Sequence, residues 1–218
     1  MLEVRELTKT FESPAGPVQV LCGLTLELEE GGGVAVLAPG GSGKSTLLQI
    51  LGTLDRPTSG TVLLGGEDPF ALDDEAQARF RNERVGFVFQ DHCLLPQLTV
   101  MENVMVPLMI GAEDTMGPER ARKLLTEVGL ADKVNDRPVQ LTAGEKQRAA
   151  IARALVRGPR LLLCDEPTGS LDNKTAHEVA ELLEKVRQEH KLTLVVATHD
   201  PVVAAKLPRR VLLTDGRL

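Results

Sequence analysis

Aromatic residues are scarce in this sequence: they make up 2% of the 218 residues, with five Phe and neither Trp nor Tyr. The core must therefore be built from aliphatic side chains. Cysteines are also few, since only Cys22, Cys93 and Cys164 are present and they lie far apart. They offer neither a disulfide framework nor the spacing of a metal site, which suits a reducing compartment.

Long apolar runs are missing as well. The longest candidate, VMVPLMI at 104–110, is interrupted by Pro107 and falls far short of the roughly 20 residues that span a bilayer. The N-terminal MLEVRELTKTF is charged where a secretory signal needs an apolar stretch. An excess of positive charge is absent too, because the net charge is −6. We therefore expect no nucleic-acid partner.

What is present is a regular order of strands and helices. Alternating apolar residues predict the first two strands, and apolar runs predict the others: 2–11, 18–30, 31–38, 60–67, 84–90, 160–167 and 192–200. Helical spacing and end signals predict helices at 118–128, at 174–190, and from Ala143 or Gly144 to the stop at Gly158. This order predicts an α/β fold with a parallel sheet core and an N-terminal antiparallel β part. Residues 91–157 are predicted to form a helical subdomain inserted between core segments 1–90 and 158–218.

The stretch APGGSGKST at 38–46 fits the phosphate-loop pattern G-x-x-x-x-G-K-[ST], except that Ala38 stands at the first glycine. Backbone N–H groups of such a turn converge on phosphate oxygens, and the following helix adds its positive end. Lys44 is expected to reach the β- and γ-phosphates of ATP, and Ser45 to ligate Mg²⁺. The residues predicted to bind nucleotide here are Ala38, Pro39, Gly40, Gly41, Ser42, Gly43, Lys44, Ser45 and Thr46. The alternative, a glycine-rich turn without ligand, is disfavoured by the strand before it and the helix after it.

Two adjacent carboxylates, Asp165 and Glu166, end the apolar run LLLCDEP at 161–167. A buried strand that ends in this way places them at the edge of the sheet where α/β folds bind ligands. We expect Asp165 to hold Mg²⁺ and Glu166 to polarise the attacking water. A solvated acidic turn is the alternative, and the upstream phosphate loop favours the functional interpretation. Together the two motifs predict a P-loop NTPase.

The stretch LTAGEKQRAAIARAL at 141–155 resembles the signature segment of ATP-binding cassette (ABC) ATPases, and LTKTF, FVFQ, GSLD and ATHD resemble other motifs of that family in its order. The resemblance implies that Phe11 stacks on adenine, Gln90 reaches Mg²⁺ and the attacking water, Asp172 lies at a subunit boundary, and His199 contacts the γ-phosphate. It also implies that a head-to-tail homodimer, or a pair with a closely related ABC subunit, sandwiches two ATP molecules. The γ-phosphate held by the other subunit would contact Leu141, Thr142, Ala143, Gly144 and Glu145.

Purely structural roles are the alternatives for single residues. Phe11 could be an ordinary core residue, Gln90 a strand cap, and His199 a strand-end histidine. The other histidines are assigned to surface positions: His92, His177 and His190.

Two departures from the family pattern concern alanine. Alanine costs about 1 kcal/mol or more only where φ is positive, and we expect Ala38 to lie where the chain is still extended. In the signature segment Thr142 and Ala143 replace serine and the first glycine, while Gly144 is kept. The extra methyl group of Thr142 is the change most able to crowd a phosphate.

The segment CLLPQLTVMENVMVPL at 93–108 resembles the ATPases of the lipoprotein-releasing and macrolide-exporter group. This implies a stand-alone ATPase subunit on the cytoplasmic face of the inner membrane, bound to separate membrane permease subunits. The sequence does not distinguish between a lipoprotein, a peptide or a drug as cargo, or a signalling role. One alternative is a soluble ABC ATPase of DNA repair or translation, although the coiled coils or zinc modules usual there are not seen. A small-molecule kinase would leave the signature segment unexplained.

Overall fold

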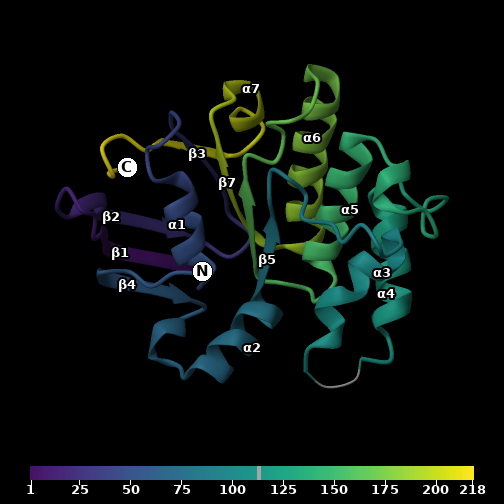
Figure 1. The fold of residues 1–218 in the computed structure, drawn as a ribbon, viewed down its shortest axis with the longest axis horizontal. Helices are drawn as coiled ribbons and strands as arrows, with labels where there is room; N and C mark the ends of the chain where they lie inside the picture. Colours follow the sequence, from purple (N-terminus) through teal and green to yellow (C-terminus); the bar gives the residue numbers. More distant parts are fainter. Residues whose placement is uncertain (112–113) are drawn as a thin grey trace.

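The fold combines two β-sheets with helices on both sides of the larger one (Figure 1). The computed structural model describes residues 1–111 and 114–218. The smaller sheet is antiparallel, with strand order β2-β1-β4. Its strands are β1 (Leu2–Phe11), β2 (Val18–Leu28) and β4 (Ser59–Leu64).

The larger sheet is parallel, with strand order β5-β6-β7-β3-β8. Its strands are β3 (Gly33–Leu37), β5 (Val85–Val88), β6 (Leu161–Asp165), β7 (Thr193–Thr198) and β8 (Arg209–Leu212). Unbroken aliphatic runs form its central strands because both faces of a parallel sheet are covered. The α/β fold with an N-terminal antiparallel part is therefore confirmed.

The alternation of side chains along β6 divides the core into two apolar clusters. Leu161 and Leu163 belong to the cluster that α1 (Lys44–Leu51) and the antiparallel sheet complete. Leu162 and Cys164 point to the opposite face, into the cluster that most of the other helices cover. Burial of the Cys164 thiol raises its pKa, which agrees with a packing role for this residue.

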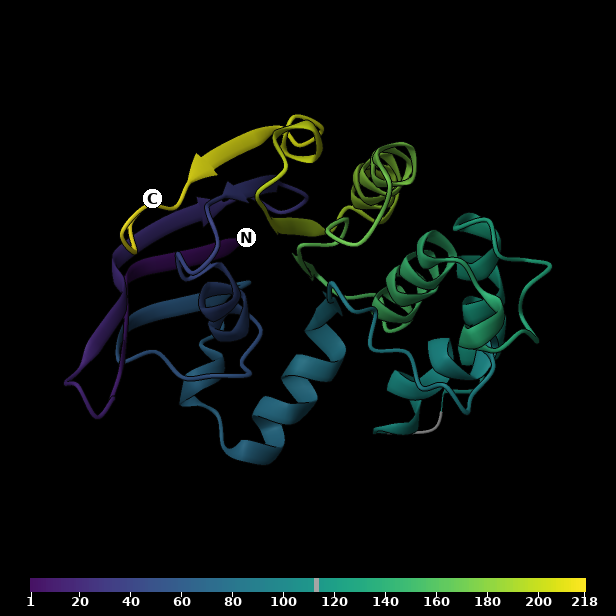
Figure 2. The same cartoon turned by 45° about the horizontal axis from the view of Figure 1, so that its top comes forward.

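Helices α3 (Val100–Met105), α4 (Gly117–Glu127) and α5 (Ala143–Leu155) lie together at one end of the molecule (Figure 2). Helix α6 (Asn173–His190) packs beside α5, which itself contacts β5, and α7 (Pro201–Ala204) follows β7. Short 3₁₀ turns occur at Pro69–Ala71, Val106–Met109 and Pro138–Gln140. Within 1–111 and 114–218, no helix combines the length and the apolar character that crossing a membrane would need.

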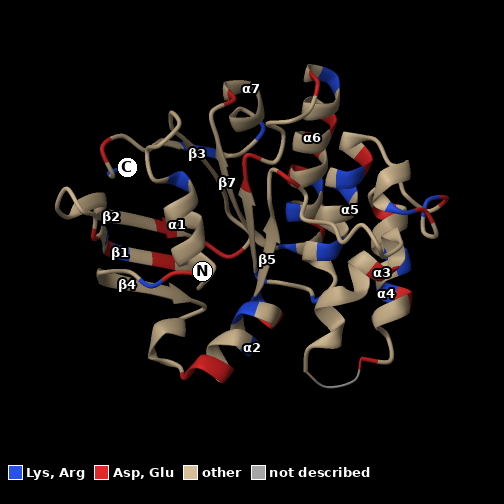
Figure 3. Cartoon of the chain, in the orientation of Figure 1, with Lys and Arg blue, Asp and Glu red and all other residues tan. Residues whose placement is uncertain are grey.

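Helix α2 (Asp74–Arg84) is the long element that the sequence patterns do not predict. It buries only Gln77 and Phe80, so no apolar stripe marks it. Its ends are well formed nevertheless, because the Asp73 side chain accepts a hydrogen bond from the amide of Ala76. Acidic residues occupy its first turn and basic residues its last turn (Figure 3), as the helix dipole favours.

Candidate functional site

The phosphate loop leaves β3 and opens α1, in the strand-to-helix position that the sequence predicts. Gly41 and Gly43 have φ of 78° and 95°, a region that side chains disfavour. A Cβ at Gly43 would also stand 2.9 Å from Cγ1 of Val20 on β2. Ala38 is 4% exposed and its φ is not positive, so alanine fits there as expected. The loop thus places glycine where its backbone requires it and alanine where it does not.

The Lys44 side chain is held against the loop by three oxygen atoms. Its Nζ donates to the carbonyl oxygens of Ala38 at 2.5 Å and Pro39 at 3.1 Å. A third partner is Oε1 of Glu166 at 3.2 Å. These contacts use all three N–H donors of the ammonium group and fix its charge at the N-terminal end of α1.

The Glu166 carboxylate lies between Lys44 and His199. Its Oε2 accepts from the amide nitrogen of His199 at 3.3 Å and is 3.0 Å from the ring Nδ1. Since the carboxylate accepts, the ring carries a proton on Nδ1 in this contact. Glu166 itself has a φ of 44°, which costs a non-glycine residue about 1–2 kcal/mol. Its amide donates to the carbonyl of Ala197 on β7 at 2.9 Å, which helps to hold this conformation.

A pocket of about 710 Å³ brings most of the predicted site residues together. They come from the carboxyl ends of neighbouring parallel strands, where ligands bind in open α/β sheets. The predicted residues that line it are Gly40, Gly41, Ser42, Gly43, Lys44, Ser45, Thr46, Gln90, Asp165, Glu166 and His199. Four further lining residues were not predicted as site residues, although Phe89 and Cys93 lie in quoted motifs: Val20, Phe89, Asp91 and Cys93.

The expected magnesium ligands share this pocket. Ser45, Gln90 and Asp165 line it with a hydroxyl, an amide and a carboxylate, and hard oxygen donors of this kind suit Mg²⁺. No cluster of three or more His, Cys, Asp or Glu residues suited to a metal ion is found in the described part of the chain, this pocket included, so the three oxygen donors named here are of mixed type. The donor chemistry therefore fits Mg²⁺ at this pocket.

Phe11, at the end of β1, lies outside this group of lining residues. Its side chain is 40% exposed, so it is not a core residue. The ammonium group of Lys9 stands 4.8 Å from the centre of its ring, a cation–π contact. One face of an exposed ring is thus engaged by a cation.

The signature segment begins α5 and does not line the pocket of its own chain. Thr142 forms a capping box, donating from Oγ1 to the Glu145 carboxylate at 2.9 Å and accepting from its amide at 3.3 Å. Hydrogen bonds from Thr142 hold the pKa of the Glu145 carboxyl below its ordinary value. Thr142 and Ala143 are exposed, whereas Leu141 and Gly144 are buried.

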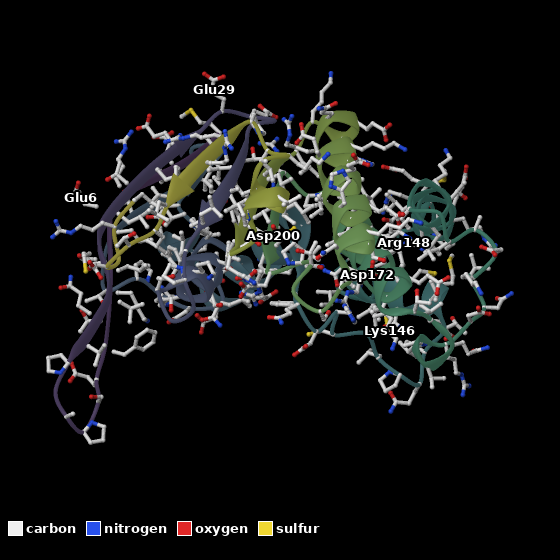
Figure 4. The ribbon with its side chains drawn as sticks, turned by 90° about the horizontal axis from the view of Figure 1, so that it is seen from above. Glu6, Glu29, Lys146, Arg148, Asp172 and Asp200 are labelled. Carbon is white, nitrogen blue, oxygen red and sulfur yellow. The ribbon has the colours of Figure 1, made fainter. Side chains whose placement is uncertain are left out.

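Gly144 and Asp172 meet at Thr175 on α6. A Cβ at Gly144 would stand 2.4 Å from Cγ2 of Thr175, so glycine is required here by packing within the chain. The Asp172 side chain caps α6 and accepts from Oγ1 of Thr175 at 2.6 Å, which lowers the pKa of its carboxyl. Figure 4 shows Asp172 close to Lys146 and Arg148 of α5. The signature and GSLD segments therefore lie side by side on one surface.

The remaining histidines differ in their surroundings. His177 and His190 are exposed, as predicted. His92 is half-buried, and its Nδ1 lies 2.5 Å from Oε1 of the fully buried Gln147. His92 is therefore at the surface only in part, because Gln147, a partner far away in the sequence, contacts its ring.

Comparison with known proteins agrees with this geometry. The family described as ABC transporter matches residues 21–169. The chain belongs to the ABC transporter family. As an ABC ATPase it binds and hydrolyses ATP, and the comparisons support the membrane-transporter interpretation over the one in DNA repair or translation.

Relatives match the whole chain. It is 53% identical to the lipoprotein-releasing system ATP-binding protein LolD of Geobacter metallireducens, covering 100% of this chain and 97% of that protein. It is 43% identical to the macrolide export ATP-binding/permease protein MacB of Syntrophobacter fumaroxidans, covering 99% of this chain but 31% of that protein.

Solved structures match the fold over the same extent. The dimeric structure of MJ0796, a bacterial ABC transporter cassette, aligns with a TM-score of 0.90 at 39% identity, covering 100% of this chain and 96% of that one. A dimeric post-hydrolysis state of the same cassette, bound to ADP and Pi, aligns with a TM-score of 0.89, also at 39% identity and with the same coverage. The family assignment therefore extends from the motifs to the complete fold.

Proposed function

We propose that this chain is the ATPase subunit of a lipoprotein-releasing transporter. The observation that carries the cargo assignment is the 53% identity to a LolD protein over the whole chain. The macrolide exporter is the second candidate, because MacB is 43% identical over 99% of this chain. Lipoprotein release is favoured because the identity to the LolD protein is the higher of the two, 53% against 43%.

The pocket geometry supports general-base hydrolysis by Glu166. Its Oε1 pairs with Lys44 at 3.2 Å, and its Oε2 is held by His199. ATP phosphates compete for the Lys44 ammonium, so Oε1 becomes free to accept a proton from the attacking water. His199 keeps the carboxylate oriented, and Lys44 stabilises the charge that develops on the phosphate.

We propose that Ser45, Gln90 and Asp165 hold Mg²⁺. The bound cation would neutralise charge on the β- and γ-phosphate oxygens. Gln90 would also orient the attacking water. Phe11 would stack on the adenine ring with the ring face that Lys9 does not cover. The loop residues Ala38 to Thr46 would enclose the phosphates with their backbone amides.

We propose that a second copy of the chain completes the site. Leu141 to Glu145 and Asp172 stand outside the pocket of their own chain, while Thr142 and Ala143 are exposed on the surface. A head-to-tail homodimer, or a pair with a closely related ABC subunit, would bring this surface to the partner's γ-phosphate. The 39%-identical cassette MJ0796, solved as a dimer in two structures, supports this arrangement. In it, core segments 1–90 and 158–218 bind the nucleotide, and helical subdomain 91–157 presents the signature segment.

We propose that separate permease subunits bind on the side formed by residues 93–108, at the cytoplasmic face of the inner membrane. Val106 and Pro107 of this segment line a second hollow of about 450 Å³. Leu54 and Ile110 line it too, and their side chains are 50% and 55% exposed. Apolar side chains left open in a concave surface are suited to a protein partner.

Lipoprotein sorting in the cells that make this protein tests the proposal. Depletion of the chain is expected to leave lipoproteins in the inner membrane, and wild-type protein is expected to restore their release. Lys44→Ala, expressed at the same level, should fail to restore it. Normal sorting after depletion, with macrolide sensitivity instead raised, would favour the exporter role and refute lipoprotein release.

A further inference from the structure

The turn that follows Gln90 is strained. His92 and Cys93 are consecutive non-glycine residues with φ of 57° and 50°. L-residues avoid this region because the Cβ approaches the following carbonyl oxygen. Such conformations persist only where surrounding contacts hold them, and they gather at functional sites. The turn at 91–93 therefore requires support from other parts of the chain.

Arg153 of α5 supplies part of that support. Its Nη2 donates to the carbonyl oxygen of His92 at 2.7 Å, and its Nη1 donates to that of Cys93. A planar guanidinium group suits two neighbouring carbonyls better than the point charge of lysine does. The Arg153 side chain is half-buried, and burial lowers the pKa of its guanidinium group.

Gln147, also on α5, fixes the start of the same turn. Its side chain is fully buried, its Nε2 donates to the carbonyl of Phe89 at 3.4 Å, and its Oε1 lies 2.5 Å from Nδ1 of His92. Gln147 and Arg153 stand about 9 Å apart along the helix axis. One helix thus holds the turn on both sides of Asp91.

Helix α5 is also the helix that begins with the signature segment. Gln90, directly before the strained turn, and Cys93, the last residue of that turn, both line the nucleotide pocket. Helix α5 is therefore hydrogen-bonded to the backbone on both sides of Gln90, at Phe89 and at His92 and Cys93, although no residue of α5 lines the pocket of its own chain.

We propose that Arg153 is a positioning residue for ATP hydrolysis: it holds the strained 91–93 turn and thereby sets the place of Gln90 relative to the start of α5. This rests on the proposed role of Gln90 in orienting the attacking water. Arg153 acts through the turn and does not touch the nucleotide. Its loss reduces turnover while ATP binding by the phosphate loop is kept.

Arg81 of α2 provides a matched control. It donates to the carbonyl oxygen of Thr53 at 3.0 Å and to its Oγ1 at 3.1 Å. Thr53 is also a non-glycine residue with positive φ, 59°, and it is buried. It follows α1 at the end away from the phosphate loop. Arg81→Gln therefore removes the same kind of contact from a strained residue outside the pocket.

The experiment compares Arg153→Gln with Arg81→Gln in the full chain. Steady-state turnover, KM for ATP and Tm are measured for both, and ATP affinity is titrated in the Glu166→Gln background. Arg153→Gln is expected to lower kcat at least about tenfold, within the roughly hundredfold that a 1 Å misplacement costs, with ATP affinity unchanged. Arg81→Gln is expected to lower Tm by a similar amount and to keep wild-type kcat. Equal kcat in the two variants would overturn the proposal.

Cys93→Gly in the Arg153→Gln background separates strain from positioning. Glycine accepts the positive φ, so Tm is expected to recover while kcat stays low. Recovery of both would reduce Arg153 to a structural role and overturn the proposal.

The failure of the proposed function would look different: wild-type chain without turnover and Glu166→Gln without ATP binding. The turn would then be followed by maleimide labelling of Cys93, with peptide mapping. If Cys93 is labelled faster in Arg153→Gln than in the wild type and in Arg81→Gln, this supports the role of Arg153 in holding the turn. Equal labelling rates contradict that role.

Discussion

Replacing Gly144 by alanine tests the packing of the signature segment. The new Cβ would stand 2.4 Å from Cγ2 of Thr175, whereas carbon atoms in good contact are about 3.5–4.0 Å apart. Gly144 is buried and lies in the first turn of α5, so neither helix can yield without moving the other. We expect Gly144→Ala to destabilise the protein although alanine is the better helix former.

The magnitude follows from two opposed effects. Overpacking of a well-packed site costs about 1–3 kcal/mol, while exchanging glycine for alanine in a helix gains at most about 1 kcal/mol. Because the 2.4 Å approach is far inside contact distance, the upper part of the overpacking range, about 2–3 kcal/mol, applies, and subtracting about 1 kcal/mol leaves a net loss of about 1–2 kcal/mol. For a domain of this size that corresponds to a Tm lower by about 2–8 °C.

The assay is urea and thermal unfolding of Gly144→Ala, Thr175→Ser and the double variant. Thr175→Ser removes the clashing methyl group and keeps the hydroxyl that donates to Asp172 at 2.6 Å. The double variant should come within about 0.8 kcal/mol of the wild type, the value of one buried carbon. If a second copy's nucleotide approaches Gly144, ATP turnover of the double variant stays low although its stability returns. Wild-type stability in the single variant Gly144→Ala would refute the packing argument.

Three further predictions concern the pocket and the charges. Glu166→Gln is expected to bind ATP normally and to lose about 10²–10⁴-fold in turnover; normal hydrolysis would remove Glu166 from the role of base. Lys44→Ala loses a charged hydrogen-bond donor to phosphate, worth about 1.5–3 kcal/mol, so Kd for ATP should rise at least about tenfold, and an unchanged titration would contradict the assignment. Hydrogen bonds from Arg187 lower the pKa of the Glu184 carboxyl below its ordinary 4.5. A lowered folded-state pKa adds stability above the unfolded value and loses it as pH falls, so Glu184→Gln should flatten the decline of unfolding free energy below about pH 4.5, and parallel pH curves for the two proteins would count against it.

Much of the fold and of the pocket can be predicted from the sequence because local patterns carry it. The apolar run at 161–165 is typical of a buried strand, and Asp165 and Glu166 end it at the edge of the sheet. Parallel strands end at the same edge. Gln90, Asp165 and His199 therefore converge with the phosphate loop in space although they are distant in sequence.

Other features could not be predicted because they depend on contacts between distant segments. Helix α2 buries too few apolar side chains to show a helical period. The partner of His92 is Gln147, and no local pattern around His92 in the sequence predicts this contact. The need for glycine at 144 is set by a methyl group of Thr175 on another helix. The positive φ of Glu166 likewise depends on its tertiary surroundings.

We propose that each nucleotide site is completed by the signature segment of a second copy. ATP turnover per subunit, measured over a wide range of protein concentration with Glu166→Gln as the blank, tests it most directly. We expect turnover per subunit to rise steeply with protein concentration and then to level off once nearly all subunits are dimeric. Turnover per subunit that stays constant down to concentrations at which only monomer is present would contradict it.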